Sequence, residues 1–340
     1  MDIEKKDLLW AASKGLVSVE QAHALWTAFT EREQESDVPS FNPIHLLYYA
    51  GALLILASMG WFLFSQWDNL DPRWLVGISS IYALLFLFLG TILWRKKDFK
   101  IVGGVFFTVA VGMVPLIIYG LERAYWPGAQ EGDSIFPIQG ILINLGTIIA
   151  ALGVLYFIRF PFLIAPLALS VWFLVYNLFR LYSINFPVGD NSESWVYLVT
   201  GVVMILGAYW LDRHSNKDFA FWFYVVGALS FWLSLTFLFL FDGGRHLEKF
   251  IYAVVNMGLL VISILLNRKI FLVLGALGLF GYFFYLAGEV FADSIFFPFA
   301  VSLLGLAVIF LGIQYQRRQD KINATILGWL PASWRSQLPH

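Results

Sequence analysis

Cysteine is absent from the 340-residue chain, and charged residues make up only 13% of it. Without cysteine the protein has no disulfide, thiolate metal site, iron–sulfur cluster or cysteine nucleophile. A formal net charge of −1 excludes a globally basic nucleic-acid binder. The charges are also too few to cover a soluble globule, in which about a quarter of the residues are charged.

Sequence motifs for catalysis and cofactor binding are missing as well. The five histidines are scattered, and none belongs to a His-Glu-x-x-His pair. No phosphate-binding Gly-x-x-x-x-Gly-Lys-Ser/Thr loop and no Gly-x-Ser-x-Gly elbow occurs. We therefore expect a protein that is not an enzyme, with no catalytic residue, no cofactor and no metal site.

Hydrophobic residues, by contrast, make up 59% of the chain. A bilayer core about 30 Å thick needs about 20 apolar residues per helix, and helices satisfy their own backbone in lipid. The sequence predicts an all-α membrane protein, a bundle of ten transmembrane helices within residues 44–316. The ten apolar runs lie near 44–65, 73–94, 100–121, 136–157, 160–182, 195–211, 219–241, 249–266, 270–291 and 295–315.

Lysine and arginine are distributed unequally between the two sides of this bundle. With the N-terminus inside, the cytoplasmic segments hold 17 of the 22 basic residues. Cytoplasmic loops of membrane proteins are enriched in Lys and Arg. We expect both termini in the cytoplasm and an even number of spans.

The second to ninth spans are predicted to pair into four hairpins, each with a short cytoplasmic turn. Arg159, Arg213 and Arg268 in the last three turns are 54 and 55 residues apart. This spacing fits a duplicated two-span unit. A tightly looped bundle that obeys the positive-inside rule would give the same spacing without duplication, so both interpretations stay open.

Residues 1–35 are predicted to form a small cytoplasmic helical hairpin, joined to the bundle by a linker, residues 36–43. Gly15 is placed to cap the first helix, and Ser18 and Gln21 fit a capping box at the start of the second. The hairpin is either a solvated extension that caps the bundle or an interaction module. Its candidate contact residues are Trp10, Leu25, Trp26 and Phe29. At the other end, residues 317–340 are expected to form a cytoplasmic tail with an interfacial helix.

Ionisable residues are missing from the centres of all ten predicted spans. Those nearest to the membrane gather at the outer ends of returning spans: Glu122, Arg180, Asp242 and Glu289. They form either a polar ring around an outward-facing cavity, with Arg180 as the ion-pair partner, or ordinary span ends that meet water.

Two asparagines, Asn144 and Asn256, are predicted near mid-depth, where they either bond a neighbouring helix or contact a ligand. Gly275, Gly278 and Gly281 in the ninth span favour close helix packing. Pro115 and Pro166 predict kinks in the third and fifth spans.

The segment from Leu9 to Ala22 carries the motif Gly-Leu-Val-Ser-x-x-Gln-Ala, formed by Gly15, Leu16, Val17, Ser18, Gln21 and Ala22. Together with the bundle that follows, it resembles a bacterial family of predicted polytopic membrane proteins of unknown function. Those proteins carry a similar Gly-Leu-Ile-Ser-x-x-Gln-Ala hairpin before the first span. The resemblance implies a multi-pass protein of the bacterial inner membrane, and it supplies no substrate or catalytic residue.

The sequence favours a non-enzymatic membrane scaffold, sensor or assembly partner that acts through its cytoplasmic hairpin. The expected partners are the lipid bilayer and a cytoplasmic protein, with no nucleic acid, and a homo-oligomer stays open. The alternative is a transporter or permease for an uncharged or apolar, lipid-like solute. A permease needs a polar-lined crevice that reaches Asn144 or Asn256, whereas a scaffold can pack both residues closely.

Overall fold

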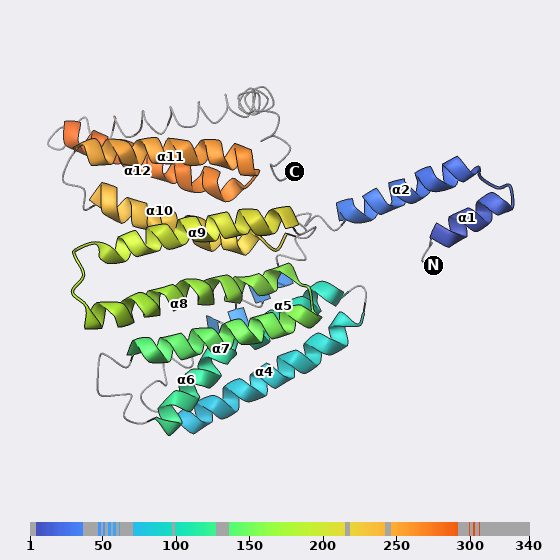
Figure 1. Ribbon diagram of the computed structural model, residues 1–340, viewed down its shortest axis with the longest axis horizontal. Coiled ribbons are helices and arrows are strands. Elements are labelled where there is room, and N and C mark those ends of the chain that lie inside the picture. Colours follow the sequence, from blue (N-terminus) through green and yellow to red (C-terminus); the bar gives the residue numbers. More distant parts are fainter. Residues whose placement is uncertain are drawn as a thin grey trace. The chain divides into compact units, whose positions relative to one another are not determined.

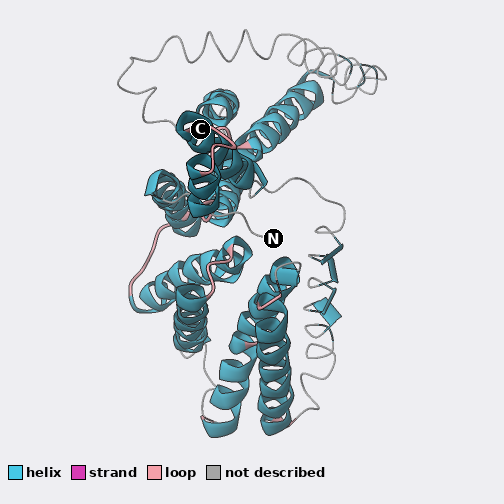
Figure 2. Cartoon of the chain, turned by 90° about the vertical axis from the view of Figure 1, so that its right-hand side faces the viewer, coloured by secondary structure: helices cyan, strands magenta, loops and turns pink. Residues whose placement is uncertain are grey.

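The computed structural model describes residues 5–36, 71–96, 99–126, 136–214, 218–241 and 246–291, with single residues between 47 and 61 and between 299 and 306. These residues form helices and no strand (Figure 2). The chain divides into two compact units, Met1–Ser58 and Met59–His340. The division falls inside the first predicted span, most of which lies outside the described residues. The domain boundaries taken from the sequence therefore stay a prediction.

The first unit contains the helical hairpin α1 (Lys5–Ser13) and α2 (Val19–Ser36). Gly15 has a φ of +71°. The amides of Gly15 and Leu16 donate to the carbonyls of Ala12 (3.0 Å) and Ala11 (3.1 Å), which is the Schellman arrangement. The predicted capping box is confirmed at the start of α2. The Gln21 amide donates to Ser18 Oγ at 3.1 Å, and the Ser18 amide donates to Gln21 Oε1 at 2.9 Å.

The second unit contains eight helical segments that are long and apolar enough to cross a bilayer, counted over the described residues. They coincide with the predicted second to ninth spans. The first and tenth predicted spans lie largely outside the described part of the chain, so the count of ten stays a prediction. The helices are α4 (Pro72–Trp94), α5 (Lys100–Gly112), α6 (Val114–Tyr125), α7 (Phe136–Phe157), α8 (Ile164–Asn185), α9 (Ser192–His214), α10 (Phe221–Leu235), α11 (His246–Leu266) and α12 (Lys269–Phe291).

Three of the described spans depart from a regular α-helix. The span Lys100–Tyr125 breaks at Met113 between α5 and α6, and Pro115 in the first turn of α6 gives the predicted kink. Pro166 lies in the first turn of α8, where a missing amide costs no hydrogen bond, and α8 continues unbroken to Asn185. Pro166 therefore does not interrupt α8, and the kink predicted there stays a prediction. Short 3-10 and π segments, η3 (Pro161–Leu163) and η4 (Thr236–Phe241), begin the α8 span and end the α10 span.

The helices pair into four antiparallel hairpins with short turns, as the sequence predicted. We call them hairpin A (α4 with α5–α6), B (α7–α8), C (α9–α10) and D (α11–α12). The contacts between hairpins follow chain order, with α7 against α5 and α6, α8 against α9 and α10, and α10 against α12. Figure 1 shows this succession from α4 to α11 and α12. The end of the unit that carries the short turns is called the turn end, and the other end is the loop end.

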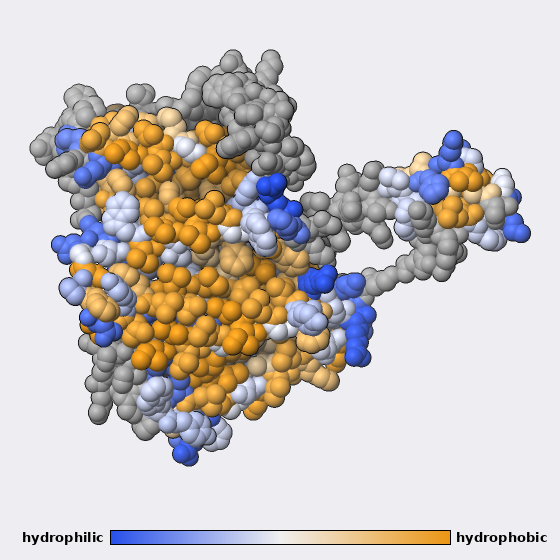
Figure 3. Space-filling view, viewed as in Figure 1, coloured by the Kyte–Doolittle hydropathy of each residue, from blue (hydrophilic) through white to orange (hydrophobic). Residues whose placement is uncertain are grey.

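A broad apolar surface covers the middle of the hairpins on the face shown in Figure 3. Figure 3 shows a hydrophobic band on one face, with hydrophilic residues gathered at the helix ends. Large apolar side chains on α4 and α7, such as Ile81, Phe88 and Ile149, are exposed. An exposed apolar patch of this extent marks a lipid-facing surface rather than a soluble one.

The buried core lies toward the turn end, where each hairpin packs on the one before it. Phe160 of hairpin B lies edge-on to Trp94 of hairpin A, with ring centroids 6.3 Å apart. Trp222 of hairpin C meets Phe162 of hairpin B at 5.3 Å, and Phe271 of hairpin D meets Tyr224 of hairpin C at 5.9 Å. These three contacts between rings connect all four hairpins in sequence.

Glycines allow the two helices of a hairpin to approach closely. A β-carbon on Gly201 of α9 would lie 2.5 Å from the backbone nitrogen of Phe231 and 2.7 Å from the carbonyl oxygen of Gly227, both in α10. Helices in lipid associate largely through such close approach of their backbones. Lipid tails are as apolar as the side chains, so burying apolar surface between helices gains little free energy.

We expect Gly201→Ala to lower the free energy of unfolding by about 1–3 kcal/mol, because backbone atoms cannot move aside as a flexible side chain would. Gly207→Ala on the same helix is the matched control, because a β-carbon at that position would have no atom within 4 Å. Helix propensity alone makes this control neutral or stabilising by up to about 1 kcal/mol. Unfolding in detergent measures both variants, and equal values would contradict the assigned helix contact.

Candidate functional site

Asn256 lies at the middle of the α11 span and is fully buried. Its Oδ1 accepts a hydrogen bond from Trp232 Nε1 of α10 at 3.1 Å, and its Nδ2 donates to the Tyr252 carbonyl one turn earlier at 2.8 Å. The hydroxyls of Tyr252 and Thr236, at the start of the π segment η4, are 3.2 Å apart. Asn256 therefore bonds a neighbouring helix, which is one of the two roles predicted for it.

The glycines of α12 make room for this asparagine. A β-carbon on Gly278 would collide with the Asn256 side-chain amide, and one on Gly275 would lie 2.8 Å from the Asn256 carbonyl oxygen. The sequence singled out Asn256 and these glycines separately, and the structure brings them into contact. The three helices α10, α11 and α12 close around one amide.

Asn144, the other asparagine predicted at mid-depth, is only 8% exposed. Its Nδ2 donates to the carbonyl of Gly140, one turn earlier in α7, at 2.6 Å. The side chain of Asn177 in α8 packs against Gly140 from the other side. Asn144 thus bonds within its own helix at a point where α7 and α8 touch.

An ion cluster that the sequence did not predict joins hairpins C and D at the turn end. Arg268 Nη2 binds both carboxylate oxygens of Asp212, at 2.8 and 3.0 Å, and Nη1 binds Asp218 Oδ2 at 2.8 Å. The side chains of Arg268 and Asp212 are 18% and 9% exposed, and that of Asp218 is 33% exposed. The two aspartates flank the turn of hairpin C, and Arg268 lies in the turn of hairpin D.

The backbone of the hairpin D turn fixes Arg268 in place. Asn267 has a φ of 52°, the left-handed conformation that ends α11. The Arg268 amide donates to the Ser263 carbonyl, and the Ser263 hydroxyl donates to the Arg268 carbonyl, both at 3.1 Å. Because both backbone polar groups of Arg268 are held, its side chain projects toward hairpin C from a defined position.

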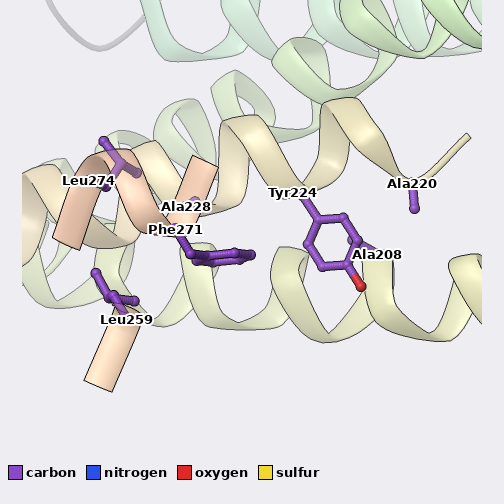
Figure 4. Close-up of a cluster of buried hydrophobic side chains, with 7 residues drawn as sticks. All are labelled: Ala208, Ala220, Tyr224, Ala228, Leu259, Phe271 and Leu274. Atoms are coloured by element: carbon purple, nitrogen blue, oxygen red, sulfur yellow. The ribbon is translucent and has the colours of Figure 1, made fainter. Parts of the chain in front are cut away.

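The guanidinium of Arg268 also covers an aromatic ring. Its central carbon lies 5.2 Å from the centroid of the Tyr224 ring, a cation–π distance. Tyr224 is fully buried in a cluster with Phe271, Leu259, Leu274 and small alanines from hairpins C and D (Figure 4). Burial lowers the pKa of Arg268, but the hydrogen bonds that its guanidinium donates to Asp218 and Asp212 outweigh burial, so the pKa is raised overall and the group stays charged.

The members of the predicted outer ring lie in different surroundings. Glu122 is buried in α6, and neither of its carboxylate oxygens has a hydrogen-bond partner among the described residues. Arg180 on α8 and Glu289 on α12 are exposed, and Asp242 lies outside the described residues. The structure thus gives no hydrogen bond between Glu122 and Arg180, and the ring stays a prediction.

The N-terminal hairpin presents apolar side chains around a shallow groove. Leu16, Val17, Gln21, Ala24, Leu25 and Ala28 line it. Leu16 is 71% exposed and Leu25 is 38% exposed. Of the other predicted contact residues, Trp10 is exposed and Trp26 is half-buried, whereas the side chain of Phe29 lies outside the described part. The groove is therefore one apolar surface of the hairpin, which also exposes Leu9, Trp10 and Val19 outside it.

Charge differs sharply between the two ends of the membrane unit. Among the described residues, the turn end holds seven basic and two acidic side chains, a net charge of +5. The loop end holds four basic and six acidic side chains, a net charge of −2. The basic excess lies on the side that the sequence assigned to the cytoplasm.

Residues 9–125 match a family model described as predicted membrane protein, DUF2157. The match covers about a third of the chain, from within α1 to the last residue of α6. No curated protein and no solved structure matches the chain. This part of the chain is thus similar to predicted membrane proteins of unknown function, and the finer resemblance of its hairpin motif stays a prediction.

We expect Arg268→Gln to destabilise the protein by about 1–3 kcal/mol, because it leaves two partly buried carboxylates without their shared cation. Asp212→Asn should cost more than Asp218→Asn, because Asp212 is more deeply buried and accepts two hydrogen bonds. The control is Lys269→Gln, an exposed neighbour expected to change stability by less than about 0.5 kcal/mol. Unfolding in detergent separates these cases, and equal losses at positions 268 and 269 would refute the cluster.

We expect a cysteine placed at Asn256 to resist membrane-impermeant thiol reagents from both sides of the membrane. The native chain has no cysteine, so each label reports a single position. The site is fully buried and enclosed by Trp232 and the glycines of α12. Asp190→Cys in the exposed loop after α8 is the reactive control. Labelling at position 256 would reveal a water-filled path and would favour a permease.

Proposed function

We propose that this membrane protein is a non-enzymatic scaffold or assembly partner whose N-terminal hairpin docks a protein. The groove along α2 carries the proposal, because it exposes Leu16 and Leu25 on a capped, ordered hairpin. Helical partners bind such grooves through apolar side chains spaced one turn apart. Ala24 and Ala28, one turn apart in the groove, leave space for the side chains of such a helix.

The charge difference between the two ends supports a location in the inner membrane with both termini in the cytoplasm. The turn end carries the net positive charge, and positive loops stay on the cytoplasmic side. An even number of spans then puts the hairpin in the cytoplasm together with its partner.

The closed packing around Asn256 supports a scaffold over the alternative, a permease for an uncharged or lipid-like solute. A solute path at mid-depth would need polar groups that face water. Asn256 is instead fully buried, and its amide is bonded to Trp232 and to the backbone of its own helix.

The test is site-specific photo-crosslinking of the full-length protein in its native membrane. Benzoylphenylalanine at Leu16 or Leu25 should give one discrete adduct, because both positions line the groove. His23, exposed on the same helix but outside the groove, is the matched control position and should give none.

A second change makes the crosslinking result specific to the groove. Ala24→Glu puts a charge on its floor and should abolish the adduct formed at Leu25. The same adduct from His23, or an adduct that persists with Ala24→Glu, would refute docking in the groove.

A further inference from the structure

The turns of hairpins A and B carry four exposed basic residues, Arg95, Lys96, Lys100 and Arg159, which we call the basic patch. None of the four forms an ion pair with a described residue. The turns of hairpins C and D differ, because there Arg268 is bound by Asp212 and Asp218. Because Arg213 and Lys269 are the other basic residues there, the described turn residues of hairpins C and D carry a net charge of +1, against +4 on hairpins A and B.

Packing at the turn end brings these two turns together. Phe160, the residue after Arg159, lies with its ring against Gly104 of α5, where a β-carbon would come within 2.5 Å of the ring. The same ring lies edge-on to Trp94, the residue before Arg95. The turn that contains Arg159 therefore packs against the end of α4 that leads into Arg95 and Lys96, although the two turns are distant in sequence.

The basic patch lies at the boundary between the apolar band and water. Trp94 ends one span and Lys100 begins the next. Tyr156 and Phe157, at the end of α7 directly before Arg159, are each 81% exposed. Aromatic side chains at this depth lie at the headgroup level of a bilayer. A ligand on the basic patch therefore meets cations on its polar side and exposed rings on its apolar side.

The first turn of α5 adds backbone donors to the basic patch. Phe99 precedes the helix, and no side chain caps its N-terminus. The first amides of a helix have no partner inside the helix, and together with the helix dipole they favour an anion. Lys100 lies at this N-terminus. The two arginines of the basic patch, Arg95 and Arg159, add side chains of a type that binds phosphate oxygens through two parallel hydrogen bonds.

We propose that the basic patch binds the phosphate groups of anionic phospholipids, with the acyl chains lying along the exposed rings of α7. The negative charge of the phosphate complements the four cations, and its oxygens can accept hydrogen bonds from the first amides of α5. The apolar chains match the surface around Tyr156 and Phe157, which a soluble anion would leave uncovered. This site is distinct from the hairpin groove and does not depend on its function.

Lipid binding to the purified full-length protein in neutral detergent tests the proposal without requiring a membrane orientation. Native mass spectrometry counts bound phosphatidylglycerol and cardiolipin against phosphatidylcholine. The double variant Arg95→Gln/Arg159→Gln should bind anionic lipid about 25-fold more weakly, because each basic residue near the surface contributes about fivefold. Phosphatidylcholine binding should not change.

The matched control removes the same number of charges from the loop end. Arg73→Gln/Arg123→Gln alters two arginines there and should leave anionic lipid binding unchanged. Arg95→Lys/Arg159→Lys keeps the charge and should retain most of the binding, which separates loss of charge from loss of fold. Equal losses in the two Gln pairs, or equal binding of phosphatidylglycerol and phosphatidylcholine, would overturn the proposal.

A soluble competitor distinguishes a lipid site from a site for free phosphate. Glycerol phosphate at millimolar concentration should not displace the lipid, because it offers no apolar chain to the rings. Displacement by glycerol phosphate would show a soluble-anion site and would also overturn the proposal.

Discussion

In a bilayer, helices gain little by burying apolar side chains against each other, because lipid tails are equally apolar. Shape and polar contacts must hold them together instead. Close approach at Gly201 and Gly227 joins the two helices of hairpin C. Aromatic contacts through Phe160, Trp222 and Phe271 then connect each hairpin to the one before it. The buried core lies toward the turn end because these contacts between hairpins lie there.

Local patterns in the sequence predicted much of this architecture. The capping box at Ser18 and Gln21 depends on residues three positions apart, and eight spans follow from apolar runs about 20 residues long. The Arg268 cluster could not be predicted in the same way. Its aspartates lie 50 and 56 residues from Arg268, and in the sequence all three look like ordinary loop charges. Two aspartates beside an otherwise basic turn were the only signal for the cluster.

The residues at mid-depth show the same contrast between features that local sequence predicts and contacts that depend on packing. Sequence alone identified Asn256 and the α12 glycines as unusual residues for a span, but their contact depends on the register of α11 against α12. Their meeting makes Gly278 a steric requirement for the Asn256–Trp232 hydrogen bond. For Asn144 the same reasoning gave two roles, and the structure adds a third, a bond to Gly140 in its own helix. Residue type predicted burial, but the bonding partner depends on the packing between helices.

Charge pairing in hairpins C and D explains why the basic patch lies on hairpins A and B. Arg268 binds Asp212 and Asp218, so the described turn residues of hairpins C and D carry a net charge of only +1, against +4 on hairpins A and B. Hairpin A, by contrast, lies in the segment that matches the predicted membrane protein family, together with the N-terminal hairpin. The matched segment thus includes the hairpin groove and three of the four basic-patch residues. Hairpin B supplies the fourth, Arg159, because Phe160 packs on Gly104 and Trp94. The proposed protein-docking groove and most of the proposed lipid site are therefore both encoded in the first third of the chain, and the later hairpins extend the membrane unit.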